Sequence, residues 1–155
     1  MELEFVVAPP ADPGAVEPYP FSLIEQPSPG DHGAMAPRFH LDWRPLLAAL
    51  LAAQAGGVTI GGMAYRFHDT LAAAIVAVAE LAGEERVVLS GGCFQNRVLV
   101  ERTVARLAAG GFRPYWHQRI PPNDGGIALG QAYAALAALA AGARPDAGGA
   151  PAARS

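Results

Sequence analysis

The chain has 155 residues, 52% of them apolar and 16% charged, and a formal net charge of −3, which fits one domain or part of a larger one. The sequence has no basic stripe, so nucleic-acid binding receives no electrostatic support. A single cysteine excludes an internal disulfide and agrees with a reducing cytoplasm.

We expect no targeting or membrane segment. The first residues, MELEF, lack the basic and apolar regions of a signal peptide. The longest apolar run, Ile127–Ala141, contains Gly130 and Gln131 and falls short of the ~20 residues that a membrane span needs. The sequence therefore predicts a cytoplasmic protein that binds neither membrane nor nucleic acid.

Residues 1–41 form a proline-rich segment, which we interpret as extended and insertion-like. Most of the prolines of the chain fall here, and proline is excluded from helix interiors and central strands. Short extended pieces are predicted between them, at Leu3–Ala8, Tyr19–Ile24 and Arg38–Leu41.

Two helices are predicted next. Asp42 is the expected N-cap of the first, which has Pro45 in its first turn and ends at Gly56-Gly57. Thr59 is the expected N-cap of a longer helix that ends at Gly83. Apolar residues recur along the longer helix at steps of three and four, which predicts one continuous buried stripe: Ile60, Met63, Phe67, Leu71, Ile75, Val78 and Leu81.

A strand, a helix and a second strand follow. Val87–Ser90 is apolar without polar alternation, which is typical of a strand covered on both faces. A helix over Asn96–Ala109 and a strand over Phe112–His117 then predict a βαβ crossover in a parallel sheet. On that helix we expect one set of side chains inward (Val98, Leu99, Val104, Leu107) and another outward (Arg97, Glu101, Arg102, Arg106).

The last predicted helix, Gly125–Ala141, closes an α/β lobe over residues 42–141. The tail, residues 142–155, consists mainly of Gly, Ala, Pro and Arg without periodicity, and we expect it to be disordered.

Two glycine turns are the candidate site. Gly91-Gly92 follows the first strand and leads into a helix, and the turn over Pro121–Gly126 opens another. Glycine lets a ligand approach the backbone closely, and a helix start presents unpaired N–H groups to an anion. The glycine pair alone is a weak signal, since many α/β proteins use such turns only to join a strand to a helix.

Each side chain near the turns has two readings. Asn96 and Asp124 are interpreted as ordinary helix caps. Asp124 could instead be a carboxylate ligand of a metal ion, which would need further ligands from elsewhere. Cys93 is a nucleophile at a helix start or, as we favour, a small packed residue. Arg97 and Arg119 can meet phosphate or an acidic partner, or be solvated.

The histidines do not make a metal site by themselves. No two of them lie at i, i+4 on one helix. His68 lies beside the apolar stripe, and we expect it to be partly exposed or hydrogen-bonded. His117 ends a strand near the second turn and can reach the cleft, although we favour a structural role.

Taken together, these motifs closely resemble the carboxyl-terminal end of the HypF carbamoyltransferase family of [NiFe]-hydrogenase maturation. The strongest stretches are VVLSGGCFQNRVLVERTVARL and GFRPYWHQRIPPNDGGIALGQA. YPFSLIE, LDWRPLLAALL and YRFHDTLAAAIVAVAE occur upstream in the same order. The resemblance covers about Tyr19–Ala135 and is strongest over Val87–Gln131.

The resemblance implies one lobe of a two-lobed actin/Hsp70/sugar-kinase (ASKHA) fold, with a mixed sheet flanked by helices. Family members make carbamoyl-adenylate from carbamoyl phosphate and ATP, and pass the carbamoyl group to the terminal cysteine of the partner HypE. Their zinc-finger region lies upstream and outside this chain. The isolated lobe is expected to be inactive.

The family pattern also assigns roles to residues. Gly91, Gly92 and Asn96 would bind the nucleotide, and Asp124 would be one carboxylate ligand of a divalent metal ion. The other ligands come from an HxxxH helix in the first lobe of the family, and this sequence contains no such motif. The alternatives are an O-carbamoyltransferase, a threonylcarbamoyl-adenosine synthase-like lobe, and a non-catalytic module that docks a partner.

Overall fold

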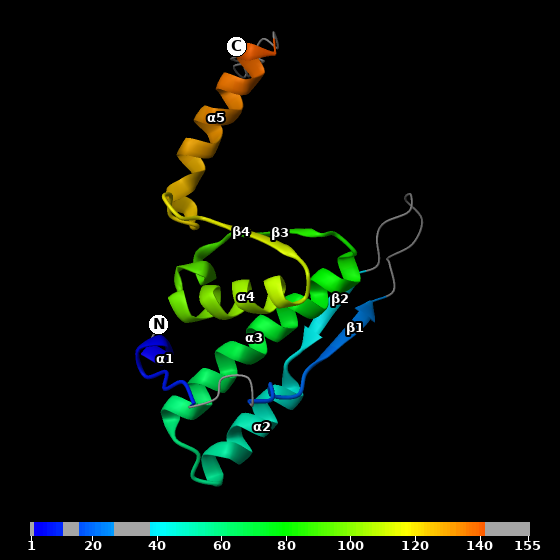
Figure 1. Ribbon diagram of the computed structural model, residues 1–155, viewed down its shortest axis with the longest axis vertical. Helices are drawn as coiled ribbons and strands as arrows, with labels where there is room; N and C mark the ends of the chain where they lie inside the picture. The colour runs from blue at the N-terminus through cyan, green and yellow to red at the C-terminus, as the bar shows by residue number, and fades with distance from the viewer. Residues whose placement is uncertain (1, 11–15, 27–37, 142–155) are drawn as a thin grey trace, which may run out of the picture.

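The computed structural model describes residues 2–10, 16–26 and 38–141, which form a mixed α/β body with one projecting helix (Figure 1). The elements in chain order are α1 (Glu2–Phe5), β1 (Ser22–Gln26), β2 (Arg38–Asp42), α2 (Arg44–Ala55), α3 (Ile60–Ala82), β3 (Arg86–Leu89), η1 (Gly92–Gln95), α4 (Arg97–Ala109), β4 (Arg113–Trp116), η2 (Asp124–Gly126) and α5 (Ile127–Ala140).

Helix α3 begins and ends where its sequence predicts. The Thr59 hydroxyl accepts a hydrogen bond from the Gly62 N–H at 3.2 Å, which satisfies one of the free donors of the first turn. Gly83 ends the helix in the left-handed conformation, at φ 68°. Glycine adopts this conformation without the steric penalty that a side chain brings.

The βαβ unit is confirmed. β3 and β4 pair in parallel, and α4 connects them while packing against α3 (Figure 1). Ala79 of α3, Leu89 of β3 and Leu107 of α4 form the buried core between these layers. This core holds β3 against the two helices, and the two glycine turns follow the ends of β3 and β4.

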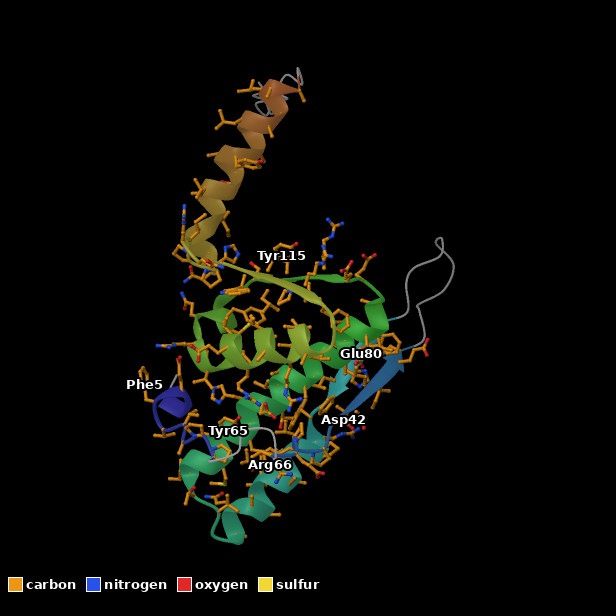
Figure 2. All side chains as sticks on the ribbon, viewed as in Figure 1. Phe5, Asp42, Tyr65, Arg66, Glu80 and Tyr115 are labelled. Carbon is orange, nitrogen blue, oxygen red and sulfur yellow. The ribbon has the colours of Figure 1, made fainter. Side chains whose placement is uncertain are left out.

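The prediction that β3 is covered on both faces is wrong. Val88 is 70% exposed, and its register partner Tyr115 is also exposed. Figure 2 shows Tyr115 on the face of the sheet that is turned away from α4. The helices in the described part of the chain cover only the other face of the sheet. The strand sequence is apolar enough for both faces to be covered, but the described residues provide no second covering layer.

The buried face of α3 differs from the predicted stripe. Ile60, Val78 and Leu81 are exposed, whereas Tyr65 and Thr70 are buried. Leu71, Ile75 and Val78 of the stripe border an open groove, while small and polar side chains of α3 face α4 and the amino-terminal segment. The apolar periodicity predicted the helix correctly. It did not predict which side chains are buried, because burial depends on what packs against each of them.

Arg102 and Arg106 were expected to point outward, and this prediction is wrong. Both guanidinium groups reach across to Asp69 of α3, whose carboxylate is fully buried. Arg106 donates to Oδ1 at 3.0 Å and to Oδ2 at 2.5 Å, and Arg102 donates its Nε–H to Oδ1 at 2.9 Å. Burial of a carboxylate is unfavourable unless such partners satisfy it, so this cluster locks α4 onto α3.

Acid is expected to weaken the Asp69 cluster. Burial raises the pKa of Asp69, but hydrogen bonds from Arg106 and Arg102 outweigh burial and hold that pKa below its ordinary value. The cluster therefore contributes its full stability above the unfolded-state pKa of about 3.9 and loses it as the pH falls through the folded-state pKa. Urea unfolding should show a free energy that decreases below about pH 4, and Asp69→Asn should remove that part of the decrease.

The amino-terminal segment departs from the extended structure expected at Leu3–Ala8, because α1 occupies Glu2–Phe5. The strands are closer to expectation, with β1 and β2 paired antiparallel. Tyr19 anchors the segment to α3: its N–H donates to Thr70 Oγ1 at 2.8 Å, and the Arg66 guanidinium lies 4.2 Å from the centre of its ring.

Asp42 is not the N-cap of α2, since Trp43 occupies that position and makes no side-chain cap. Asp42 ends β2 instead, and its carboxylate accepts hydrogen bonds from the N–H and Nε of Arg44 at 3.1 and 2.8 Å. Pro45 lies in the first turn of α2, as predicted.

Helix α5 projects away from the body (Figure 1) and has no buried residue. Leu129, Tyr133 and Leu136 are all more than half exposed. In the described ranges, no helix combines the length and hydropathy that a bilayer crossing requires. The predicted disordered tail, residues 142–155, lies outside the described residues.

Candidate functional site

The two glycine turns border one cavity, as the sequence predicts. Its volume is about 380 Å³, and Gly91, Gly92 and Asp124 all line it. β3 and β4 are parallel, so their carboxyl ends lie at the same edge of the sheet and carry the two turns to the same place. Ligands of open α/β sheets bind at this edge.

A hydrogen bond joins the turns directly. The Gly91 N–H donates to the Pro122 carbonyl at 2.7 Å. Gly91 has φ 107°, where an L side chain is strained, so glycine is needed at this position. A Cβ on Gly92 would have Asn123 Cβ as its nearest neighbour, at 3.9 Å, so space for a ligand lies directly above the Gly92 backbone.

The glycine pair does not lead straight into α4, contrary to expectation. The 3₁₀ turn η1 intervenes, and its first hydrogen bond runs from the Phe94 N–H to the Gly91 carbonyl. The N–H groups of Gly92 and Cys93 therefore lie outside the hydrogen-bond pattern of that turn. The start of α4 is already occupied, because the Arg97 N–H donates to the Glu4 carboxylate at 2.6 Å. Backbone donors for a ligand would come from the glycine turn rather than from α4.

His117 reaches the cavity. It lies just beyond β4, and its Nε2 is 3.1 Å from the hydroxyl oxygen of Ser90, just beyond β3. This pair places a hydroxyl and an imidazole at the strand ends beside the glycines. The sequence favours a structural role for His117 and gives no signal for Ser90 beyond its place at a strand end, although both residues follow strands that lead into the two turns.

Asp124 is exposed at the cavity, and it is not a helix cap. Asn123 provides that cap, since its side-chain oxygen accepts from the Gly125 N–H at 3.1 Å. Among the described residues there is no group of three or more His, Cys, Asp or Glu that could hold a metal ion. These residues therefore do not complete a metal site, and Asp124 offers a single carboxylate donor.

Asn96 caps α4, as the simpler of its two readings predicts. Its Oδ1 accepts from the Leu99 N–H at 2.9 Å, and its amide nitrogen is 2.8 Å from Nε2 of His68. His68 is buried and hydrogen-bonded, which confirms the second part of the expectation for it. Asn96 is not among the residues that line the cavity, and its contact with a nucleotide stays a prediction.

The other candidates lie outside the cavity lining. Cys93 is exposed rather than packed as favoured. Arg97 is exposed and pairs with Glu101 at 2.7 Å. Arg119 is exposed at the start of the second turn.

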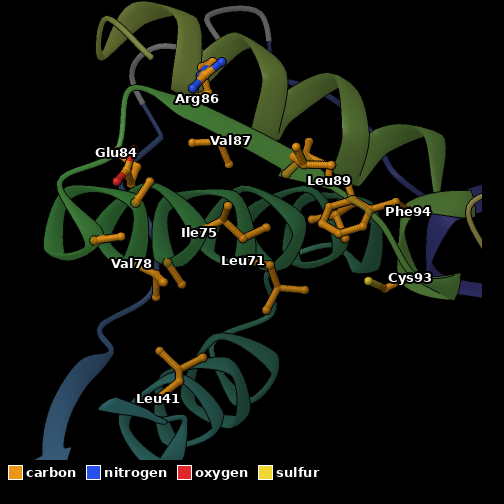
Figure 3. Close-up of a pocket in the computed structure, with 15 residues that line it drawn as sticks. Leu41, Leu71, Ile75, Val78, Glu84, Arg86, Val87, Leu89, Cys93 and Phe94 are labelled. Atoms are coloured by element: carbon orange, nitrogen blue, oxygen red, sulfur yellow. The ribbon is translucent and has the colours of Figure 1, made fainter. Parts of the chain in front are cut away.

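A second, larger hollow is apolar and open. It has a volume of about 590 Å³ and runs along α3 from Glu84 and Arg86 at one end to Cys93 and Phe94 at the other (Figure 3). Leu71, Ile75 and Val78 line its middle. This groove lacks converging polar groups, so a charged substrate fits the polar cavity at the strand ends better.

Comparison with known proteins gives one consistent result. Residues 1–131 match the family model described as carbamoyltransferase, Kae1-like domain, second subdomain. The chain is 40% identical over 98 residues to carbamoyltransferase HypF of Synechocystis sp., and 44% identical over 100 residues to carbamoyltransferase HypF2 of Cupriavidus necator. These alignments cover 63% and 62% of this chain but only 12% of each relative.

The fold is similar to solved structures of the same kind. A crystal structure of full-length HypF in the phosphate- and nucleotide-bound form aligns with a TM-score of 0.71 and 31% identity, over 89% of this chain and 17% of that one. A HypF crystal structure from T. kodakarensis aligns with a TM-score of 0.51 over 67% of this chain and 14% of that chain, and at 23% identity it supports the fold alone.

Proposed function

Since the chain belongs to the HypF carbamoyltransferase family, as the second subdomain of the Kae1-like domain, we propose that its polar cavity is one wall of the site for carbamoyl-adenylate. The observation that carries the proposal is the meeting of Gly91, Gly92 and Asp124 around one cavity at the carboxyl ends of two parallel strands. The chain corresponds to about one eighth of its curated relatives, so the opposite wall belongs to the remainder of such a protein.

The proposed reaction is the transfer of a carbamoyl group. Carbamoyl phosphate and ATP would supply carbamoyl-adenylate, and the acceptor would be the terminal cysteine thiolate of HypE. The sulfur attacks the carbamoyl carbon, a carbon–sulfur bond forms, and the carbon–oxygen bond to the phosphate breaks as AMP leaves. We place this chemistry in the cytoplasm and in a two-lobed ASKHA domain, with zinc bound only in a separate region of the full-length protein.

This chain would bind and orient the adenylate rather than attack it. A mixed anhydride is already activated, and its transfer needs alignment and stabilisation of the leaving phosphate. The bare backbone of Gly92 allows the phosphate or ribose to lie against the main chain, since a Cβ there would have no neighbour closer than Asn123 Cβ at 3.9 Å. The nearby Ser90–His117 pair supplies polar groups beside the same position.

Asp124 is proposed as one ligand of a divalent metal ion. A carboxylate and a phosphate in the same cavity repel each other unless a cation lies between them. The described residues supply only this one acidic donor at the cavity, so the remaining ligands would come from outside this chain. Such an ion would offset the charge of the phosphate.

The proposal is tested with Gly92→Val in a full-length HypF protein that carries this chain. The two added methyl groups would enter the space where the ligand lies, and we expect the affinity for a non-hydrolysable ATP analogue to fall about tenfold or more. Isothermal titration calorimetry measures this loss. The Cβ position at Gly92 is open, so the variant should fold.

The matched control is Gly56→Val at the exposed end of α2, where the φ of −78° suits any residue and the nearest neighbour of a Cβ is the Ala52 carbonyl oxygen at 3.4 Å. It should leave the affinity unchanged. Equal affinity in Gly92→Val and the unaltered protein would contradict the placement of the nucleotide. A full-length protein that binds no nucleotide would favour the docking-module alternative.

A further inference from the structure

His68 connects the long helix to the glycine loop. Its side chain is buried on α3, with only 3% of the residue exposed. One ring nitrogen, Nδ1, lies 2.7 Å from the Ala64 carbonyl one turn earlier on the same helix. The other, Nε2, lies 2.8 Å from the side-chain nitrogen of Asn96, which is the last residue before α4. A single imidazole thus holds both elements.

The hydrogen bonds around Asn96 fix the proton on the His68 ring. The side-chain oxygen of Asn96 accepts from the Leu99 N–H at 2.9 Å, so the amide nitrogen must face His68. An amide nitrogen is only a donor, and Nε2 must therefore accept. The proton then resides on Nδ1, which donates to the Ala64 carbonyl. The arrangement requires a neutral ring in one tautomer.

From Asn96 the hydrogen bonds continue to the cavity. The Asn96 N–H donates to the Cys93 carbonyl at 3.1 Å and closes η1. The Phe94 N–H donates to the Gly91 carbonyl at 3.0 Å, and the Gly91 N–H donates to Pro122 at 2.7 Å. Both glycine turns at the cavity are therefore connected to His68 by a series of hydrogen bonds that passes through Asn96 and η1.

We propose that His68 is a positioning residue for the nucleotide, acting through Asn96 on the Gly91-Gly92 backbone. This inference rests on the proposed function of the cavity. A one-turn 3₁₀ helix has weak hydrogen-bond geometry, and glycine has many accessible backbone conformations, so this loop needs an external anchor to keep one shape. His68 provides the anchor from the buried face of α3 without touching the ligand.

Two variants separate positioning from packing. His68→Leu fills the space but removes the acceptor for Asn96, whereas His68→Gln can place its amide oxygen near the position of Nε2. In a full-length HypF protein that carries this chain, His68→Leu should weaken binding of a non-hydrolysable ATP analogue about tenfold, the effect of losing one interior hydrogen bond. His68→Gln should recover most of that loss. His40→Leu, on exposed β2, is the matched control.

The tautomer is measured on the 155-residue chain itself. Nitrogen-15 NMR of the His68 ring should show a protonated Nδ1 and an unprotonated Nε2, and His68→Leu should shift the amide signals of Gly91 and Gly92. The opposite tautomer, or unshifted glycine signals, would overturn the inference even if the leucine variant of the longer protein fails to fold. Equal nucleotide affinity in all variants would overturn it while leaving the proposed function intact. Absence of binding by the unaltered full-length protein would overturn the proposed function, and with it the nucleotide role of His68.

Discussion

Replacing Asp69 with asparagine is expected to lower the free energy of unfolding by about 3–5 kcal/mol, which is the usual effect of removing one member of a buried ion cluster. Asp69 is fully buried and accepts hydrogen bonds from Arg102 and Arg106. An asparagine amide at this position would leave two guanidinium groups without a counter-charge and would turn one N–H donor toward other donors. Urea denaturation of the chain, followed by circular dichroism, measures the change.

Glu101→Gln is the matched control, because it also removes one carboxylate from an arginine pair on α4. Arg97 and Glu101 are both exposed, with 83% and 59% of their side chains accessible. Exposed pairs of this kind contribute about 0.5 kcal/mol or less. An Asp69→Asn effect no larger than that of the control would show that the buried cluster does not hold α4 on α3.

Replacing Asp124 with alanine in a full-length HypF protein that carries this chain is expected to remove the proposed divalent metal ion and to lower the proposed carbamoyl transfer about a hundredfold or more. Even changes in residues that only orient metal ligands weaken metal sites by roughly 10–100-fold. Asp124 is exposed at the cavity, so its removal should leave the fold intact. Metal content by mass spectrometry and carbamoyl transfer to HypE are the two measurements.

The control for Asp124→Ala is Glu80→Ala, which removes an exposed carboxylate near the far end of α3 (Figure 2). This control should keep both the metal and the activity. Full metal stoichiometry in the Asp124 variant would contradict the ligand role. Lost activity with retained metal would instead indicate that Asp124 contacts the substrate directly.

Local chemistry predicted both ends of α3 and the start of α4, although it misplaced the caps at Asp42 and Asp124, and distant contacts decided what the elements bury. The caps Thr59, Gly83 and Asn96 depend on neighbours within a few residues, so they can be read from the sequence. The inward orientation of Arg102 could not, because its partner Asp69 lies 33 positions earlier on another helix. A polar run in the middle of an apolar helix, His68-Asp69-Thr70, was the available signal that such partners exist.

The sequence predicted which backbone turns form the candidate site, but not the side-chain contacts around them. Gly91 and Asp124 follow β3 and β4, and the parallel pairing of these strands brings the two residues to one cavity. The order of strand, helix and strand in the sequence already implied that pairing. The link from His68 to Asn96 was not predictable, because it depends on how α3 crosses the start of α4. The exposure of Val88 was missed for a different reason: the strand sequence suits a sheet covered on both faces, while the described residues cover one.

The projecting helix α5 has a consequence for how this polypeptide behaves in water. Leu129, Tyr133, Leu136 and Leu139 recur along it at steps of three and four, which places them on one face, and each is more than half exposed. An exposed apolar helix face of this kind binds other apolar surfaces, so it recruits chaperones or promotes aggregation at high concentration. Synthesis within a longer chain that shields the helix co-translationally would avoid that hazard.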